Sequence, residues 1–230
     1  MDLQGFGHLL ISGTWVTIQL ALSSLLVGLV FGLTGAAAKL SKNPIARWLA
    51  TGYTTLVRGL PELLLVLTIY FGGSQLLMWI AGSFGYTEYI EIGPFVAGVA
   101  ALSIAFGAYA TEVFRMAMME IPQGQWESGL ACGMSRSRTF FRIILPQVWR
   151  LAIPGLGNLF QVLLKDTALV SVVGLNDIMR QSQVAISSTK EPFTFFMVAA
   201  CIYLLLTAAT TAFTMFMERA ANPAARGNRG

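Results

Sequence analysis

The sequence has little charge and few of the side chains that usually perform enzyme chemistry. Only 11% of its 230 residues are charged, against roughly 25% in soluble domains. It has a single histidine, His8, and two cysteines, Cys132 and Cys201. It contains no GxxxxGK[ST] phosphate-binding loop, no HExxH motif and no nucleophile elbow. We therefore expect no catalytic residue, no metal or cofactor site and no ATP binding in this chain.

Long apolar runs take the place of charge. The chain is 55% hydrophobic and its mean hydropathy is +0.67, which indicates an integral membrane protein. The N-terminus lacks a basic segment, so the first run does not resemble a cleaved signal peptide. About 20 apolar residues suffice for a helix to cross the bilayer, and the sequence predicts an all-α membrane protein with five transmembrane helices in one domain, 1–230. The expected spans are about 9–38, 50–83, 92–114, 151–175 and 193–217, with a short polar tail at 218–230.

The start of the second span is ambiguous. Residues 48–57 are apolar but too few to cross a bilayer alone, and the stretch RGLPE (58–62) separates them from the apolar run that follows. We interpret residues 48–57 as the tilted or re-entrant start of the second span. A separate interfacial helix is the alternative.

Most of the 15 basic residues lie on one side of these five spans. The other side has only Arg180 and Lys190, and Lys165 falls inside a span. Because basic residues collect on the cytoplasmic side, we expect the N-terminus outside and the C-terminus inside. The loop 119–146, between the third and fourth spans, would then face the cytoplasm.

That loop combines charge with an apolar cluster. Residues 127–146 read ESGLACGMSRSRTFFRIILP. A free tail would not need its aromatic and aliphatic residues, and a membrane span could not carry its arginines. The pattern predicts a short helix, a turn near Gly133 and a second amphipathic helix stopped by Pro146, which is the shape of a docking element. The alternative is an ordinary cytoplasmic loop.

The same stretch resembles the EAA loop of ABC-importer permeases. Glu127, Gly133, Ile143 and Pro146 stand at the family's spacing, while small residues other than alanine occupy 128–129. RGLPE, AYATEVFR, GQWESGLACG, FRIILPQVWR and KDTALVSVVGL follow in order. Over nearly its whole length the chain thus resembles membrane permease subunits of type I ABC importers for polar amino acids, of the Q-like histidine and lysine–arginine–ornithine type.

The resemblance implies half of a translocation path in the bacterial inner membrane. It also implies a second permease subunit (a paralogue or a copy), a pair of ATP-binding cassette subunits that use ATP-Mg, a periplasmic amino-acid-binding protein and surrounding membrane lipid. No nucleic acid is expected. In the family this loop is a cytoplasmic coupling helix seated on the ATPase. The coupling residues would be Glu127, Ser128, Gly129, Gly133, Ile143 and Pro146.

Lys165 and Asp166 are adjacent opposite charges inside the fourth apolar run. Charges within the membrane usually mark function, and adjacent helix positions diverge by about 100°, so the two side chains should meet different partners. Together with Glu112, at the end of the third span, they are our candidates for a path for basic amino acids or histidine. The alternative is that Lys165 and Asp166 only fix this helix to its neighbours.

Two other functions stay open on the sequence alone. An ion-coupled secondary transporter would commonly show internal repeats, and five spans do not divide into equal halves. A non-transporting membrane scaffold would have little use for charges at 165–166. Neighbouring genes for a P-loop ATPase and a secreted binding protein would favour the importer over both.

Overall fold

The computed structural model describes residues 5–85 and 91–221. Within these residues the chain forms helices and turns and no strand. Five helical stretches are long and apolar enough to cross a membrane, which confirms the predicted all-α fold with five spans. They run over Gly7–Leu40, Glu62–Gly82, Pro94–Met119, Arg136–Val173 and Pro192–Ala221.

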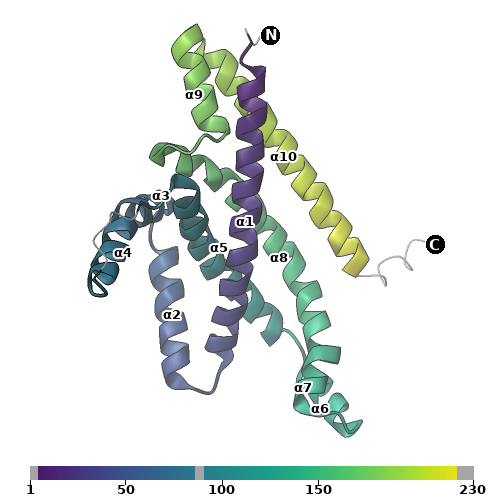
Figure 1. The fold of residues 1–230 in the computed structure, drawn as a ribbon. Helices are drawn as coiled ribbons and strands as arrows, with labels where there is room; N and C mark the ends of the chain where they lie inside the picture. Colours follow the sequence, from purple (N-terminus) through teal and green to yellow (C-terminus); the bar gives the residue numbers. More distant parts are fainter. Residues whose placement is uncertain (1–4, 86–90, 222–230) are drawn as a thin grey trace, which may run out of the picture.

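The core is centred on the contact between α1 (Gly7–Leu40) and α5 (Pro94–Met119). Small residues on α1 let the two helices approach closely. A Cβ added to Gly28 would lie 2.7 Å from the Phe106 ring, and one added to Gly32 would lie 2.7 Å from the Ala110 side chain. The long N-terminal helix is therefore packed tightly onto the third span, which it crosses in Figure 1.

The second span does not begin where the sequence predicted. The interpretation of residues 48–57 as its tilted start is wrong, because they belong to a separate helix, α2 (Pro44–Arg58). With 15 residues, α2 is about 22 Å long, too short to cross a hydrocarbon core of about 30 Å. The spanning stretch comes next, as α3 (Glu62–Leu67), the π-helical η1 (Thr68–Gly72) and α4 (Gly73–Gly82).

Local chemistry explains both ends of α2. Asn43 accepts a hydrogen bond from the Ile45 N–H at 2.9 Å, and Pro44 occupies the first turn, where its missing N–H costs little. At the other end, Pro61 disfavours helical backbone at the residue before it. Helix α2 therefore returns antiparallel along α1 before the chain turns outward at α3 (Figure 1).

The fourth span begins earlier than predicted, and Pro146 does not stop a helix. Helicity continues from α7 (Arg136–Thr139) through the π-helical η2 (Phe140–Ile144) into α8 (Leu145–Asp166). The wider π turn lies directly before Pro146, where an ordinary α-helix would place a carbonyl against the proline ring. Pro154 also lies inside α8.

The remaining helices mark the two ends of the molecule. Helix α6 (Gln123–Ala131) lies with α7 at one end, and α9 (Ile178–Thr189) lies near the start of α1 at the other (Figure 1). The fourth span reaches α9 through the 3-10 helix η3 (Thr167–Val173). The last span, α10 (Pro192–Ala221), includes the start of the predicted tail, and residues 222–230 lie outside the described residues.

Candidate functional site

The turn between α6 and α7 is built around Gly133. Its φ is +75°, a left-handed conformation that glycine adopts without strain. The Gly133 N–H donates to the Leu130 carbonyl at 2.9 Å, and the Met134 N–H donates to the Gly129 carbonyl at 3.1 Å. These two bonds form a Schellman motif, the common helix ending with glycine in this conformation. The predicted turn at Gly133 is therefore present, and its backbone geometry favours glycine.

Close packing holds α6 against the helix that follows. A Cβ added to Gly129 would lie 2.5 Å from Thr139 Cγ2, so only glycine fits there unless Thr139 moves. Trp126 stacks on Phe140 with ring centroids 6.2 Å apart. The Gln147 amide donates to the Gln125 side-chain oxygen at 3.3 Å. The helix–turn–helix 123–144 is thus a compact unit at one end of the bundle.

The predicted coupling residues divide between the surface and the interior of this unit. Glu127, Ser128 and Gly133 are exposed, whereas Gly129 is buried. Ile143 is half-buried within η2, and Pro146 is exposed at the start of α8. Glu127, Ser128 and Gly133 lie on α6 and its turn, where a second protein could reach them.

Asp166 does meet other polar groups, but not those the sequence suggested. It lines a cavity of about 20 Å³ together with Glu62 and Tyr109. The Tyr109 hydroxyl donates to Glu62 at 3.5 Å. Lys165 is exposed and does not line this cavity. The cavity has room for about one water molecule, so an amino acid could enter only if the helices separated.

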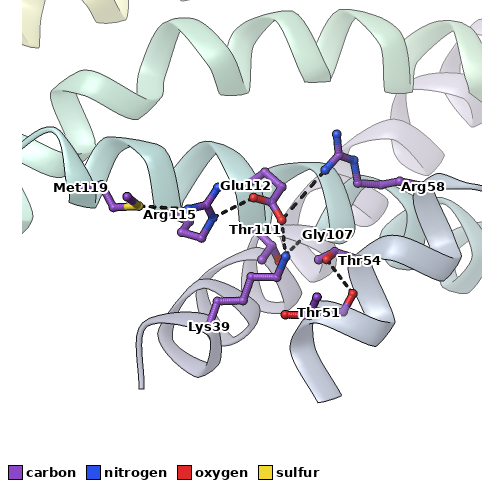
Figure 2. A network of polar contacts seen from close by, with 9 residues as sticks. All are labelled: Lys39, Thr51, Thr54, Arg58, Gly107, Thr111, Glu112, Arg115 and Met119. Atoms are coloured by element: carbon purple, nitrogen blue, oxygen red, sulfur yellow. Dashed lines mark hydrogen bonds and ion pairs between the residues drawn. The ribbon is translucent and has the colours of Figure 1, made fainter. Parts of the chain in front are cut away.

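Glu112 lies in a different cluster, shown in Figure 2. It accepts hydrogen bonds from Lys39 and, at 2.8 Å, from Arg115 Nε. The Arg58 guanidinium approaches Glu112 Oε1, the oxygen that accepts from Lys39, at 4.0 Å. Three cations thus surround this one carboxylate, and it does not face Asp166.

Arg58 connects the two clusters. Its guanidinium lies over the Tyr109 ring, 5.3 Å from the centroid, while its tip approaches Glu112. Tyr109 in turn contacts Glu62. Sequence reasoning missed Glu62, Tyr109 and Arg58 as site residues. The available signal was RGLPE itself, since two charges beside a proline interrupt an otherwise apolar stretch.

At the opposite end of the molecule, Asp177 caps α9. One carboxylate oxygen accepts from the Arg180 N–H at 2.9 Å, and the Thr17 hydroxyl of α1 accepts from the Ile178 N–H at 3.3 Å. The side chain is fully buried, and its second oxygen and the buried Tyr203 hydroxyl have no hydrogen-bond partner among the described residues. Burial raises the pKa of the Asp177 carboxyl to about 6, against the backbone hydrogen bonds, which lower it.

The five apolar helical stretches and the helix–turn–helix at their end define a multi-pass membrane component. Residues 14–223 match the family described as binding-protein-dependent transport system inner membrane component, and the chain belongs to that family. This also places it among multi-pass inner membrane proteins.

Named relatives and a solved structure agree with this assignment. The chain is 43% identical over 217 residues to the histidine/lysine/arginine/ornithine transport system permease protein HisQ of Escherichia coli K12, covering 94% of this chain and 95% of HisQ. It is 46% identical over 211 residues to the arginine ABC transporter permease protein ArtQ of the same strain, covering 86% and 88%. A crystallised amino acid ABC transporter with histidines superposes with a TM-score of 0.80 at 32% identity, covering 95% of this chain and 98% of that one.

Proposed function

We propose that the chain is the membrane permease subunit of an ATP-driven importer for basic amino acids or histidine. It forms half of a translocation path and does not hydrolyse ATP itself. The observation that carries the proposal is the helix–turn–helix 123–144, a compact exposed unit at the end of a five-span bundle. The relatives named for histidine, lysine, arginine and ornithine support the substrate class.

The helix–turn–helix is the coupling element. Glu127 and Ser128 present an exposed polar face on α6, and the rigid Gly133 turn fixes α6 relative to α7. Because α7 continues through η2 into α8 without a break, a displacement of α6 is transmitted directly to the fourth span. Closure of two partner ATPase subunits on ATP-Mg would move this element, and with it the helix that carries Asp166.

The acidic cavity is the cation-binding part of the path. Glu62 comes from α3 and Asp166 from the end of α8, so both carboxylates face one space between two spans. Carboxylates paired with a guanidinium, imidazolium or ammonium group form strong charge-assisted hydrogen bonds. In the closed arrangement the cavity is too small for substrate. Alternating access must therefore widen the space between α3 and α8.

The complete transporter has further subunits. A second permease, paralogous or identical, faces the acidic cavity across the path, and a periplasmic binding protein delivers the amino acid. The helix–turn–helix faces the cytoplasm and α9 faces the periplasm. The arginines at 136–150 beside the coupling element support this orientation through the bias of basic residues toward the cytoplasm.

Reconstitution tests the function. The chain, purified with its co-expressed ATPase and second permease, is placed in liposomes with ATP-Mg inside and binding protein outside. We expect uptake of labelled arginine, lysine or histidine that stops without ATP or without the binding protein. Uptake driven by a sodium or proton gradient alone would instead indicate an ion-coupled transporter, and no uptake by a fully assembled complex would indicate a scaffold.

Cysteine labelling tests the orientation. The exposed native cysteines, Cys132 and Cys201, are first replaced by serine. An impermeant thiol reagent added to intact cells should label Ser187→Cys in α9 but should label Ser137→Cys in α7 only after the membrane is opened. Both positions are exposed, so the contrast reports sidedness and not burial. Labelling of Ser137→Cys in intact cells would overturn the orientation.

A further inference from the structure

A second cavity of about 600 Å³ opens beside the Glu112 cluster and lies apart from the acidic cavity. Helices α1, α2 and α5 form its walls. Figure 2 shows Lys39, Arg58 and Arg115 converging there on Glu112. The lining residues are Lys39, Pro44, Arg47, Trp48, Thr51, Arg58, Glu112 and Arg115.

The charges lining this cavity do not balance. Glu112 is the single carboxylate among the lining residues, and it is already satisfied by Lys39 and Arg115. Arg47 also lines the cavity, without an ion pair among the described residues, and Arg58 reaches Glu112 only at 4.0 Å. Four cations thus surround one anion, and the cavity retains positive charge for a further anionic group.

The cavity lies at the level where a membrane surface is expected. Lys39 is in the last turn of α1, at the end of a long uncharged helix. Next to Arg47, the Trp48 side chain is 73% exposed, and tryptophan beside basic residues is typical of the membrane–water interface. Ile45, Leu49 and Leu56 are exposed on the same helix, α2. Helical periodicity places those three side chains on the other face of α2 from Arg47 and Arg58, whereas Pro44 and Trp48 line the cavity itself. An occupant would therefore meet the cations and the Trp48 ring together.

We propose that this cavity binds the phosphate headgroup of an anionic phospholipid. The phosphate lies between Arg47, Arg58 and Arg115, and the acyl chains leave the cavity past Trp48. Basic pockets between membrane helices on the cytoplasmic side favour anionic headgroups. A lipid fits better than a free anion, because a soluble ion would make no use of the exposed Trp48 ring that lines the cavity beside the cations.

Fluorescence quenching of Trp48 tests the proposal in the assembled complex. The complex is placed in nanodiscs that contain a rising fraction of brominated phosphatidylglycerol or of brominated phosphatidylcholine. The chain has 5 tryptophans, so the fluorescence of Trp48→Phe complexes is subtracted to leave the signal of Trp48. We expect Trp48 to be quenched at a lower fraction of the anionic lipid. Arg47→Gln should raise the half-quenching fraction about five-fold, as expected for the loss of one lipid-facing cation.

Lys42→Gln is the matched control. Lys42 is exposed, lies five positions before Arg47 in the sequence and does not line the cavity, so this variant should quench like the wild type. Equal quenching by the two lipids, or equal shifts for both variants, would overturn the proposal. So would protection of Trp48 by millimolar inorganic phosphate, which indicates a soluble-anion site. Absence of quenching by either lipid would show that a protein partner covers this face.

Discussion

Thr139 packs so closely onto Gly129 that a Cβ at position 129 would lie 2.5 Å from Thr139 Cγ2 and 2.8 Å from Thr139 Oγ1. The contact joins α6 to α7 across the Gly133 turn. The ABC-importer loop that this stretch resembles prefers alanine at position 129. The pairing of glycine with threonine keeps the two helices in contact where alanine would need more room.

Gly129→Ala should therefore weaken coupling of transport to ATP hydrolysis. Forcing a methyl group into a packed contact costs about 1–3 kcal/mol, and the strain falls on the orientation of α6. We expect uptake per ATP hydrolysed to fall several-fold. Gly124→Ala, in the same helix but with open space around its Cβ, is the control and should keep wild-type coupling.

A double variant tests whether the loss of coupling comes from the clash with Thr139 or from any substitution in α6. Thr139→Ala removes both atoms that approach position 129 most closely, and the Thr139 hydroxyl has no hydrogen-bond partner among the described residues. Gly129→Ala combined with Thr139→Ala should recover most of the lost coupling. If the double variant is as poorly coupled as Gly129→Ala, the clash with Thr139 is not the cause.

The second prediction concerns the backbone conformation of Gly133. No other atom lies within 4 Å of a Cβ built at this glycine, so only its positive φ opposes a side chain. A left-handed L-residue costs about 1–2 kcal/mol, and asparagine tolerates this conformation better than alanine. We expect Gly133→Ala to uncouple transport more than Gly133→Asn does, measured as uptake per ATP hydrolysed. The reverse order would mean that side-chain size at the docking surface, and not φ, decides coupling.

The sequence predicted what local patterns determine. Apolar runs of sufficient length indicated the five spans, and Gly133 indicated the turn between α6 and α7. The sequence did not predict that the helix continues through Pro146. The π turn at 140–144 makes this possible, and no single residue type indicates such a turn. A proline alone indicates a stop.

Contacts between distant residues could not be predicted in the same way. Glu112 pairs with Arg115, three positions away on the same helix, but its contact with Lys39 joins positions 73 apart. Asp166 and Glu62 likewise lie on different spans. A single sequence shows that charges at such positions are unusual, but it does not show their partners. The fold is needed to show which of them meet.

Asp166→Asn provides the third prediction. The change keeps the shape of the side chain and removes the charge that would meet a cationic substrate, a contact worth about 1.5–3 kcal/mol. We expect the kcat/KM of arginine uptake to fall about ten- to hundred-fold, while complex assembly and basal ATPase activity persist. Lys165→Gln, next to it but exposed and outside the cavity, should have little effect. Loss of assembly, or unchanged uptake, would indicate that Asp166 only fixes the helix.

The last prediction concerns pH and the cap of α9. Burial raises the pKa of Asp177 to about 6, above its value of about 3.9 in an unfolded chain. Between these two values the folded protein binds more protons than the unfolded chain, so this group's contribution to stability falls as pH rises from about 4 to about 6 and is constant above that. The difference is at most about 3 kcal/mol for a shift of this size.

Asp177→Asn isolates that contribution. Asparagine caps helices about as well as aspartate, so the hydrogen bond to the Arg180 N–H can persist while the titrating proton is lost. Other carboxylates also titrate in this range, so the quantity to measure is the melting temperature of the variant complex minus that of the wild type, at pH 4.5 and at pH 7. We expect this difference to be more positive at pH 7, because only there does the wild type carry a buried charge. A difference that does not change with pH would show that Asp177 does not titrate in this interval.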